Sequence, residues 1–204
     1  MRLSLLGRFL LVAVAALLCL MPLWYFFCAD WLAAPVIHMA GKAFGSLFHW
    51  VRDYELRGTT GVLFTQLKVY GPQGGLVTPQ VDYRMIGYGM VLLWAVLIAS
   101  WSRGWWRKLL LGSLIMLPVQ ALSVCVQWLN DVANRAGPDA LAQSRLPQWV
   151  ADAAAFGFHF NLFIFTALAP VLLWLLLDRA FIDRLWHEIR HQPLSDKRKK
   201  LQKW

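Results

Sequence analysis

Four long apolar stretches alternate with polar segments along this chain of 204 residues. They cover residues 5–27, 85–101, 109–129 and 153–177. Apart from Arg8, near the start of the first stretch, none of them contains Asp, Glu, Lys or Arg. Because a helix needs roughly 20 apolar residues to cross the hydrocarbon core of a bilayer, the pattern predicts four transmembrane helices. We therefore expect an all-α integral membrane protein that forms a single membrane domain.

The first stretch could also be a cleaved signal peptide, because it is N-terminal and follows a basic residue. It is longer than the apolar core of a usual signal peptide, and no small-residue cleavage site follows it. We therefore expect an uncleaved anchor over residues 5–27.

Residues 30–83 have a different pattern and are expected to form an insert outside the membrane. Between Leu32 and Val51, apolar residues recur every three or four positions, which predicts an amphipathic helix. Residues 61–70 and 76–83 read as two strands joined by the turn Gly-Pro-Gln-Gly-Gly at 71–75, which predicts a small β-hairpin. A lone hairpin is only marginally stable, so it should pack on the helix or on a partner protein. The candidate partner contacts are Val62, Phe64, Gln66, Lys68 and Tyr70.

The distribution of Lys and Arg predicts the orientation. Thirteen of the 20 fall in the segment before the first stretch, in the 102–108 turn and in the tail at 178–204, counting Arg8 with the first segment. Only seven lie in the insert and in the connection between the third and fourth stretches. Because Lys and Arg are retained in the cytoplasm, both termini should lie inside a bacterial inner membrane, with the insert outside. The net charge of +9 is explained by these flanking residues and does not indicate a nucleic-acid partner.

The basic end of the tail has two interpretations. Its cations could bind the headgroups of anionic lipids or an acidic partner. They could also be a solvated stop-transfer signal, which is the interpretation that we favour. The residues concerned are Lys197, Arg198, Lys199 and Lys200.

Several polar residues interrupt the third and fourth stretches. Their exposure to hydrocarbon would be costly, so they should face other helices or a wet cavity. We favour interhelical hydrogen bonds over a contact face for another membrane protein, and rank a substrate path through a small oligomeric transporter or channel subunit third. The candidates are Gln120, Ser123 and Gln127 on one face of the third stretch, and His159, Asn161 and Thr166 in the fourth.

Catalytic chemistry has one weak candidate. Cys28 could act as the nucleophile of a membrane thiol transpeptidase or hydrolase if His38, His49 or His159 lowered its pKa. The sequence contains no HxxH or HExxH motif for a metal, and no Gly-rich nucleotide loop is completed by Lys-Ser or Lys-Thr. We therefore expect no enzyme, no metal site and no cofactor.

Three segments together resemble one family. They are Thr65-Gln-Leu-Lys-Val, then Met85-Ile-Gly-Tyr-Gly-Met-Val-Leu-Leu-Trp-Ala followed by Ala99-Ser100, and Leu168-Ala-Pro-Val-Leu-Leu-Trp-Leu-Leu-Leu177. In this order they are similar to the exosortase H-associated membrane proteins. The resemblance implies a small inner-membrane companion of an exosortase, the transpeptidase-like enzyme that processes proteins with a C-terminal sorting signal. It carries no catalytic residues over to this chain.

These observations lead to one functional expectation. The chain should be a non-catalytic accessory or scaffold subunit of a bacterial system for protein processing or export. Its expected partners are the lipid bilayer and a larger integral membrane protein, with an exosortase as the candidate.

Overall fold

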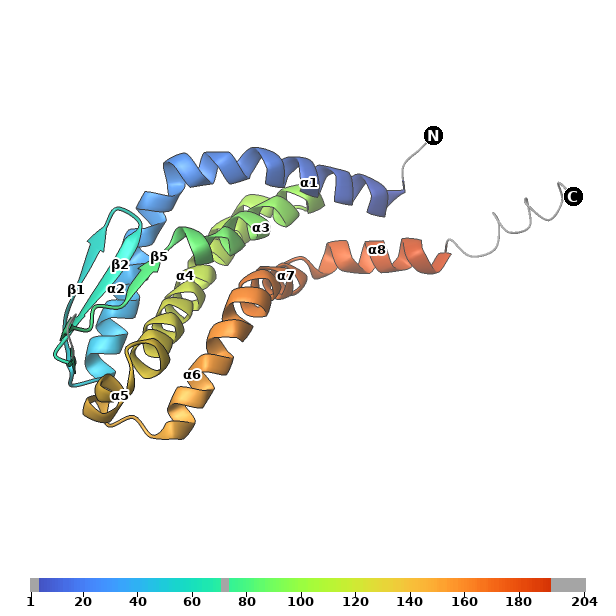
Figure 1. Ribbon diagram of the computed structural model, residues 1–204. Helices are drawn as coiled ribbons and strands as arrows, with labels where there is room; N and C mark the ends of the chain where they lie inside the picture. The colour runs from blue at the N-terminus through green and yellow to red at the C-terminus, as the bar shows by residue number, and fades with distance from the viewer. Residues whose placement is uncertain (1–3, 71–73, 192–204) are drawn as a thin grey trace, which may run out of the picture.

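The computed structural model describes residues 4–70 and 74–191, and these are mostly helical with a small β-sheet at one end (Figure 1). The helices are α1 (Leu5–Leu23), α2 (Ala29–Leu47), α3 (Arg84–Ser100), α4 (Trp105–Asn130), α5 (Pro138–Ser144), α6 (Gln148–Phe160), α7 (Thr166–Leu177) and α8 (Arg179–His191). The π-helical turns are η1 (Trp24–Cys28), η2 (Asp131–Arg135) and η3 (Asn161–Phe165). The strands are β1 (Val51–Arg57), β2 (Thr60–Thr65), β3 (Lys68–Val69), β4 (Gly75–Leu76) and β5 (Gln80–Asp82).

The first apolar stretch and the amphipathic segment form one continuous helix, not two separate elements. The π-helical turn η1 joins α1 to α2, and the run extends for 43 residues from Leu5 to Leu47. At 1.5 Å per residue it is about 65 Å long, roughly twice the thickness of a hydrocarbon core. The predicted helical character of residues 32–47 is confirmed, but the predicted end at Val51 is wrong.

An aromatic cluster lies where this long helix ends. Phe48 has extended backbone angles, and its ring lies 4.6 Å from that of Phe44 and 5.0 Å from that of Trp50. The Phe44 ring also meets the Trp128 ring edge-on at 5.8 Å, so the cluster fixes the exit of α2 against α4. The chain then turns directly into β1, which contains Val51.

The sheet is larger than the predicted hairpin. Strands β1, β2 and β5 form an antiparallel sheet with β2 in the centre, and β3 pairs with β4 in a second, two-stranded sheet. The predicted pairing of residues 61–70 with 76–83 is therefore confirmed, whereas β1 was not predicted. Residues 71–73 of the predicted turn lie outside the described residues. The sheet packs closely on α2, since a Cβ added at Gly61 would lie 2.5 Å from the Ile37 Cδ1 atom.

Helix α3 lies in the middle of the bundle and contacts α1, α4 and α7. Met90, Val91 and Leu93 are all buried, although they point in different directions around the helix. Gly89 lets α7 approach α3 closely. A Cβ at Gly89 would lie only 2.6 Å from the Thr166 carbonyl oxygen of α7, so the α3–α7 packing depends on a bare backbone at this position.

The third and fourth apolar stretches are longer as helices than predicted. The third becomes α4 and η2, a continuous run from Trp105 to Arg135. The fourth begins at Gln148, not at residue 153, and continues through α6, η3 and α7 to Leu177. The polar connection between them contains the short helix α5.

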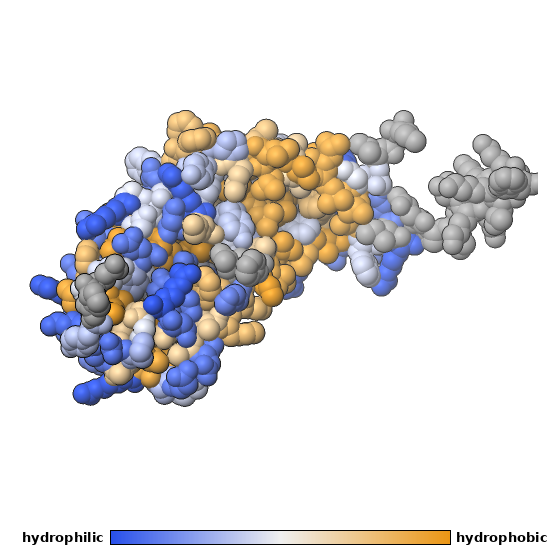
Figure 2. Space-filling model, viewed as in Figure 1, coloured by the Kyte–Doolittle hydropathy of each residue, from blue (hydrophilic) through white to orange (hydrophobic). Residues whose placement is uncertain are grey.

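By length and composition, two helical runs could cross a membrane, Leu5–Leu47 and Trp105–Arg135. Arg84–Ser100 and Thr166–Leu177 are shorter apolar helices. On the face shown in Figure 2, hydrophobic residues gather in a band over α1 and α3, while hydrophilic residues cover the sheet at one end and gather again near α8 at the other. On this face, a largely apolar surface thus lies between two hydrophilic ends.

Replacing Gly89 by alanine should destabilise the protein. The added methyl group would press on the α7 backbone, so we expect a loss of about 1–3 kcal/mol, as for other overpacked cores. The matched control is Gly45→Ala in α2, where a Cβ would meet nothing closer than 4.0 Å. Thermal unfolding in detergent would measure both variants, and a Gly89→Ala protein at least as stable as Gly45→Ala would contradict this account of the packing.

Candidate functional site

Three groups of polar residues join elements of the bundle, and the first lies near α8. The Lys108 ammonium is 2.7 Å from Asp178 Oδ1 and also donates to Ser102 Oγ at 2.7 Å. The Asp178 side chain is fully buried, and that of Lys108 is 21% exposed. These residues come from the start of α4, the start of α8 and the short connection between α3 and α4. The ion pair therefore ties together three segments at one end of the bundle.

The environment of Asp178 favours its charged form. Burial alone would raise the pKa of this carboxyl group. Hydrogen bonding to Lys108 and to neighbouring serine hydroxyls, together with the positive charge of Lys108, outweighs burial and lowers the pKa below its ordinary value. Asp178 is thus an anion at neutral pH, and Lys108 is its counter-charge.

The second group lies between α3, α4 and α7 and contains four of the predicted polar residues. The Tyr83 hydroxyl donates to Gln120 Oε1 at 3.0 Å, and Gln120 Nε2 donates to the Gly87 carbonyl at 3.2 Å. The Ser123 hydroxyl donates to Asn161 Oδ1 at 2.7 Å. All of these side chains are buried, so their polar atoms are satisfied between helices.

The π-helical turn η3 places Asn161 in this group. Its carbonyl accepts a 2.7 Å hydrogen bond from the Thr166 hydroxyl, while its side chain faces Ser123 on α4. π-helical turns often occur at functional sites, because the extra residue redirects neighbouring side chains. Here the redirected side chain joins α4 to the α6–α7 run.

The other two predicted residues of these stretches lie elsewhere. Gln127 is only half-buried, and no interhelical hydrogen bond joins it to another described residue. His159 is exposed, and its Nδ1 atom lies 2.8 Å from the Ala155 carbonyl of its own helix. Sequence spacing placed them near the same level, but the structure does not bring them into one polar group.

The third group lies where α3 begins. The Arg84 guanidinium stands 4.4 Å from the centre of the Tyr25 ring and 3.5 Å from Asp30 Oδ1. It joins the start of α3 to the junction between α1 and α2. Sequence analysis did not predict this cluster or the Lys108–Asp178 pair. For the latter a signal existed, since both residues were expected on the cytoplasmic side.

The predicted partner strip is only partly exposed. Gln66, Lys68 and Tyr70 are exposed and Phe64 is half-buried. Val62 is only 3% exposed, so its prediction as a surface contact is wrong. The reason is that β2 is the central strand, and Val62 is flanked by Glu55 of β1 and Gln80 of β5.

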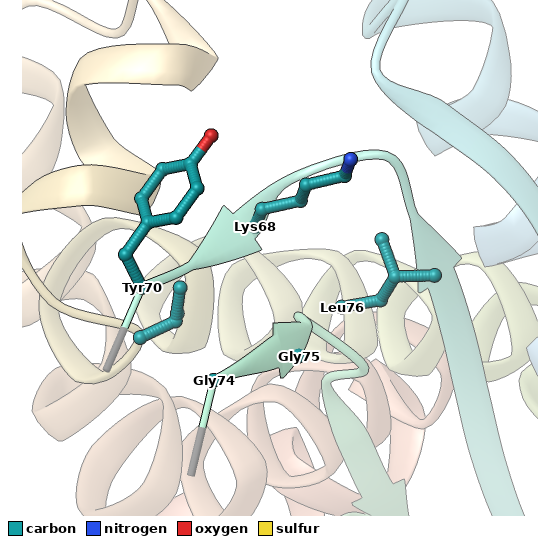
Figure 3. A pocket seen from close by; sticks show the side chains of 6 residues that line it. Lys68, Tyr70, Gly74, Gly75 and Leu76 are labelled. Carbon is teal, nitrogen blue, oxygen red and sulfur yellow. The ribbon is translucent and has the colours of Figure 1, made fainter. Parts of the chain in front are cut away.

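A pocket of about 340 Å³ adjoins this strip (Figure 3). Lys68 and Tyr70 line it from the β3 segment, and Gly74, Gly75 and Leu76 line it from the β4 segment. The Gln143 side chain of α5 fixes β3, because it accepts from the Lys68 N–H at 3.0 Å and donates to the Lys68 carbonyl at 2.6 Å. One amide thus pairs with the backbone as a neighbouring strand would. Sequence analysis did not single out Gln143.

The candidate nucleophile is not joined to its candidate bases by any hydrogen bond among the described residues. Cys28 is a half-buried free thiol in η1. The His38 ring meets the Tyr54 ring edge-on at 5.3 Å, and His49 is exposed. Within residues 4–70 and 74–191, no group of three or more His, Cys, Asp or Glu residues could hold a metal ion. The lipid candidates Lys197, Arg198, Lys199 and Lys200 lie outside the described residues.

The fold is an apolar helical bundle with a small sheet at one end, and its apolar helices are compatible with membrane spans. A sequence model of the family described as Exosortase H-associated membrane protein matches residues 3–181. The chain therefore belongs to this family, and the resemblance of its three motifs is confirmed. No curated protein and no solved structure matches it.

Replacing Asp178 by asparagine should destabilise the protein, because it leaves the Lys108 ammonium without its counter-charge. We expect a loss of about 3 kcal/mol, the low end for a broken buried pair, since Lys108 keeps some contact with solvent. The double variant Lys108→Met/Asp178→Asn should recover part of this loss. Asp183→Asn, at an exposed site on α8, is the matched control and should change little.

Acid should weaken the same interaction. The folded-state pKa of Asp178 is lowered, so its stabilisation is complete above the ordinary Asp pKa of about 3.9 and is lost as the pH falls through the folded-state value. Thermal unfolding in detergent, measured between neutral pH and pH about 3, should show this loss of stability in the wild type. The Asp178→Asn variant should not show it. Equal stability of the two proteins at neutral pH would contradict the assignment.

Proposed function

We propose that this chain is a non-catalytic accessory subunit that binds a larger integral membrane protein, an exosortase, in the bacterial inner membrane. Membership of the exosortase H-associated family supports a membrane protein with such a partnership. The observation that carries the proposal is the exposed strip Gln66, Lys68 and Tyr70, which Gln143 holds at the end of the molecule away from α8 (Figure 1).

The proposed membrane arrangement has four spans: α1, α3, the first part of α4, and the run over residues 153–177 that contains the end of α6, η3 and α7. Two charged groups support it, because one lies at each end of α3. Arg84 begins this helix, and Ser102, the hydrogen-bond partner of Lys108, follows its end. The 17 residues of α3 extend about 25 Å, close to the thickness of a hydrocarbon core of roughly 30 Å. Charged side chains are stable at these two levels, where water and headgroups can reach them.

In this arrangement, the second half of the long N-terminal helix leaves the membrane. Asp30 marks the exit, and α2 continues outward with the sheet packed on it. Helix α2 also packs against α4, whose last part and η2 rise beside it. The imbalance of Lys and Arg supports the orientation, with both termini in the cytoplasm and the sheet outside.

The strip has the properties of a contact surface. Tyr70 is 70% exposed, and tyrosine is enriched among the residues that dominate binding energy at protein interfaces. Lys68 beside it is exposed and offers a charge for orientation. Because Gln143 already occupies the backbone groups of Lys68, this part of β3 offers side chains to a partner, not an open strand edge. A partner that covers the strip would also stabilise β3 and β4, which have only two residues each.

Photo-cross-linking in native membranes tests the proposed contact. A photoreactive amino acid at Gln66 or Tyr70 should capture a larger membrane protein, whereas the same group at Asp152, exposed on α6, should capture several-fold less. Gln143→Ala should weaken the captures from Tyr70, because β3 loses both side-chain hydrogen bonds that hold it. Mass spectrometry would identify the captured protein.

Two results would contradict the contact. One is capture of only lipid or of a second copy of this chain from Gln66 and Tyr70. The other is equal capture of the larger protein from Asp152.

A further inference from the structure

A second pocket, of about 210 Å³, lies at the opposite end of the bundle from the sheet. Three elements line it: the start of α1, the end of α3, and α8. Its cations are Arg8 of α1 and Arg184 of α8. Among the residues that line it, Ser100 is the one that is both polar and buried. Ser100 lies next to the segment that holds the Lys108–Asp178 pair. The two arginines are 176 positions apart in the sequence but line one pocket.

The Arg184 Nε atom donates to the Ala180 carbonyl of its own helix at 3.2 Å, and the Arg184 guanidinium lies 5.8 Å from the centre of the Phe181 ring, which leaves its two terminal nitrogens for a ligand. Among the described residues, neither Arg8 nor Arg184 forms an ion pair. The carboxylate of Glu188 is nearby, but it accepts a 3.0 Å hydrogen bond from the Leu5 N–H at the start of α1. The pocket therefore presents two positive charges on exposed side chains, and the nearby acid is engaged by the helix start.

One wall of the pocket is aromatic, because Phe9 and Phe181 line it. The Phe9 ring lies 5.2 Å from the Phe181 ring and stacks on the Trp174 ring at 5.2 Å. All three rings are buried. A site with a cationic rim above an apolar wall suits an amphipathic ligand, one with an anionic head and a hydrocarbon part.

In the proposed membrane arrangement, the pocket lies at the level of the lipid headgroups. At its edge, Trp101 stacks on Trp105 at 5.4 Å, and Trp101 is 69% exposed, as expected for indoles at a membrane interface. Helix α8 is strongly amphipathic. It buries Phe181 in the bundle and exposes Trp186 and Arg184, so it is suited to lie along the interface.

We infer that this pocket binds the phosphate of an anionic phospholipid, with Arg8 and Arg184 as the two cationic contacts. Basic pockets between membrane helices bind anionic headgroups because the phosphate gains charge-assisted hydrogen bonds while its acyl chains stay in the bilayer. The inference rests on the proposed membrane arrangement, but not on the identity of the protein partner. The bound lipid joins α8 to α1 and thereby fixes α8 at the surface.

Native mass spectrometry of the full-length protein in a non-ionic detergent tests this site. Phosphatidylglycerol should bind roughly thirtyfold more tightly than phosphatidylcholine of the same acyl chains, the size expected for two cations near the headgroup. Arg8→Gln/Arg184→Gln should abolish this preference. Arg8→Lys/Arg184→Lys, which keeps both charges, should retain most of it.

The control variant is Arg107→Gln/Arg190→Gln, which removes two exposed arginines from the same end of the molecule but not from the pocket. It should keep the preference for phosphatidylglycerol. An equal loss in this control would show attraction to general surface charge and overturn the inference. Equal binding of the two lipids by the wild type would also overturn it.

Inorganic phosphate distinguishes the lipid from a free anion. At millimolar concentration it should leave phosphatidylglycerol binding unchanged, because it lacks the acyl chains. Full displacement would assign the pocket to a soluble anion and overturn the lipid inference. If the double glutamine variant does not fold, the single variants Arg8→Gln and Arg184→Gln should each weaken binding severalfold, and their unaltered binding would count against the site.

Discussion

Hydrocarbon offers no hydrogen-bond partner, and this constraint accounts for where the polar groups of the bundle lie. Four of the buried polar side chains are joined in pairs between helices, Gln120 to Tyr83 and Ser123 to Asn161. Formal charges occur instead near the two ends of α3, where Lys108 meets Asp178 and Arg84 meets Asp30. The bundle is therefore held by apolar packing through its middle and by polar contacts at defined levels.

The same bundle supports the sheet. Because the first helix continues through η1, α2 extends beyond the apolar band and provides a surface on which β1 and β2 pack. The small pair β3 and β4 is fixed separately by Gln143 of α5. For a member of the exosortase H-associated family, this arrangement suits an accessory subunit, since a rigid support presents a small exposed strip to a larger protein.

The sequence predicted the parts of the structure that depend on local pattern. Apolar stretches locate α1, α3, α4 and α7, and turn residues with β-branched neighbours locate the pairing of β2 with β5. It did not predict β1, because a bulge near Arg52 and its charged residues disturb the apolar alternation. It misplaced Val62, because burial depends on which strand is central. It also missed pairs such as Lys108 with Asp178, 70 positions apart, since only the packed fold selects partners across such separations.

The central claim is that the apolar bundle crosses the membrane with the sheet outside and the start of α4 inside. Labelling of single cysteines with a membrane-impermeant maleimide tests it most directly, in a variant that lacks Cys19, Cys28 and Cys125. In intact spheroplasts, Gln66→Cys, between β2 and β3, should be modified, whereas Arg103→Cys, just before α4, should react only after lysis. Modification of both positions from the same side of the intact membrane would contradict the account.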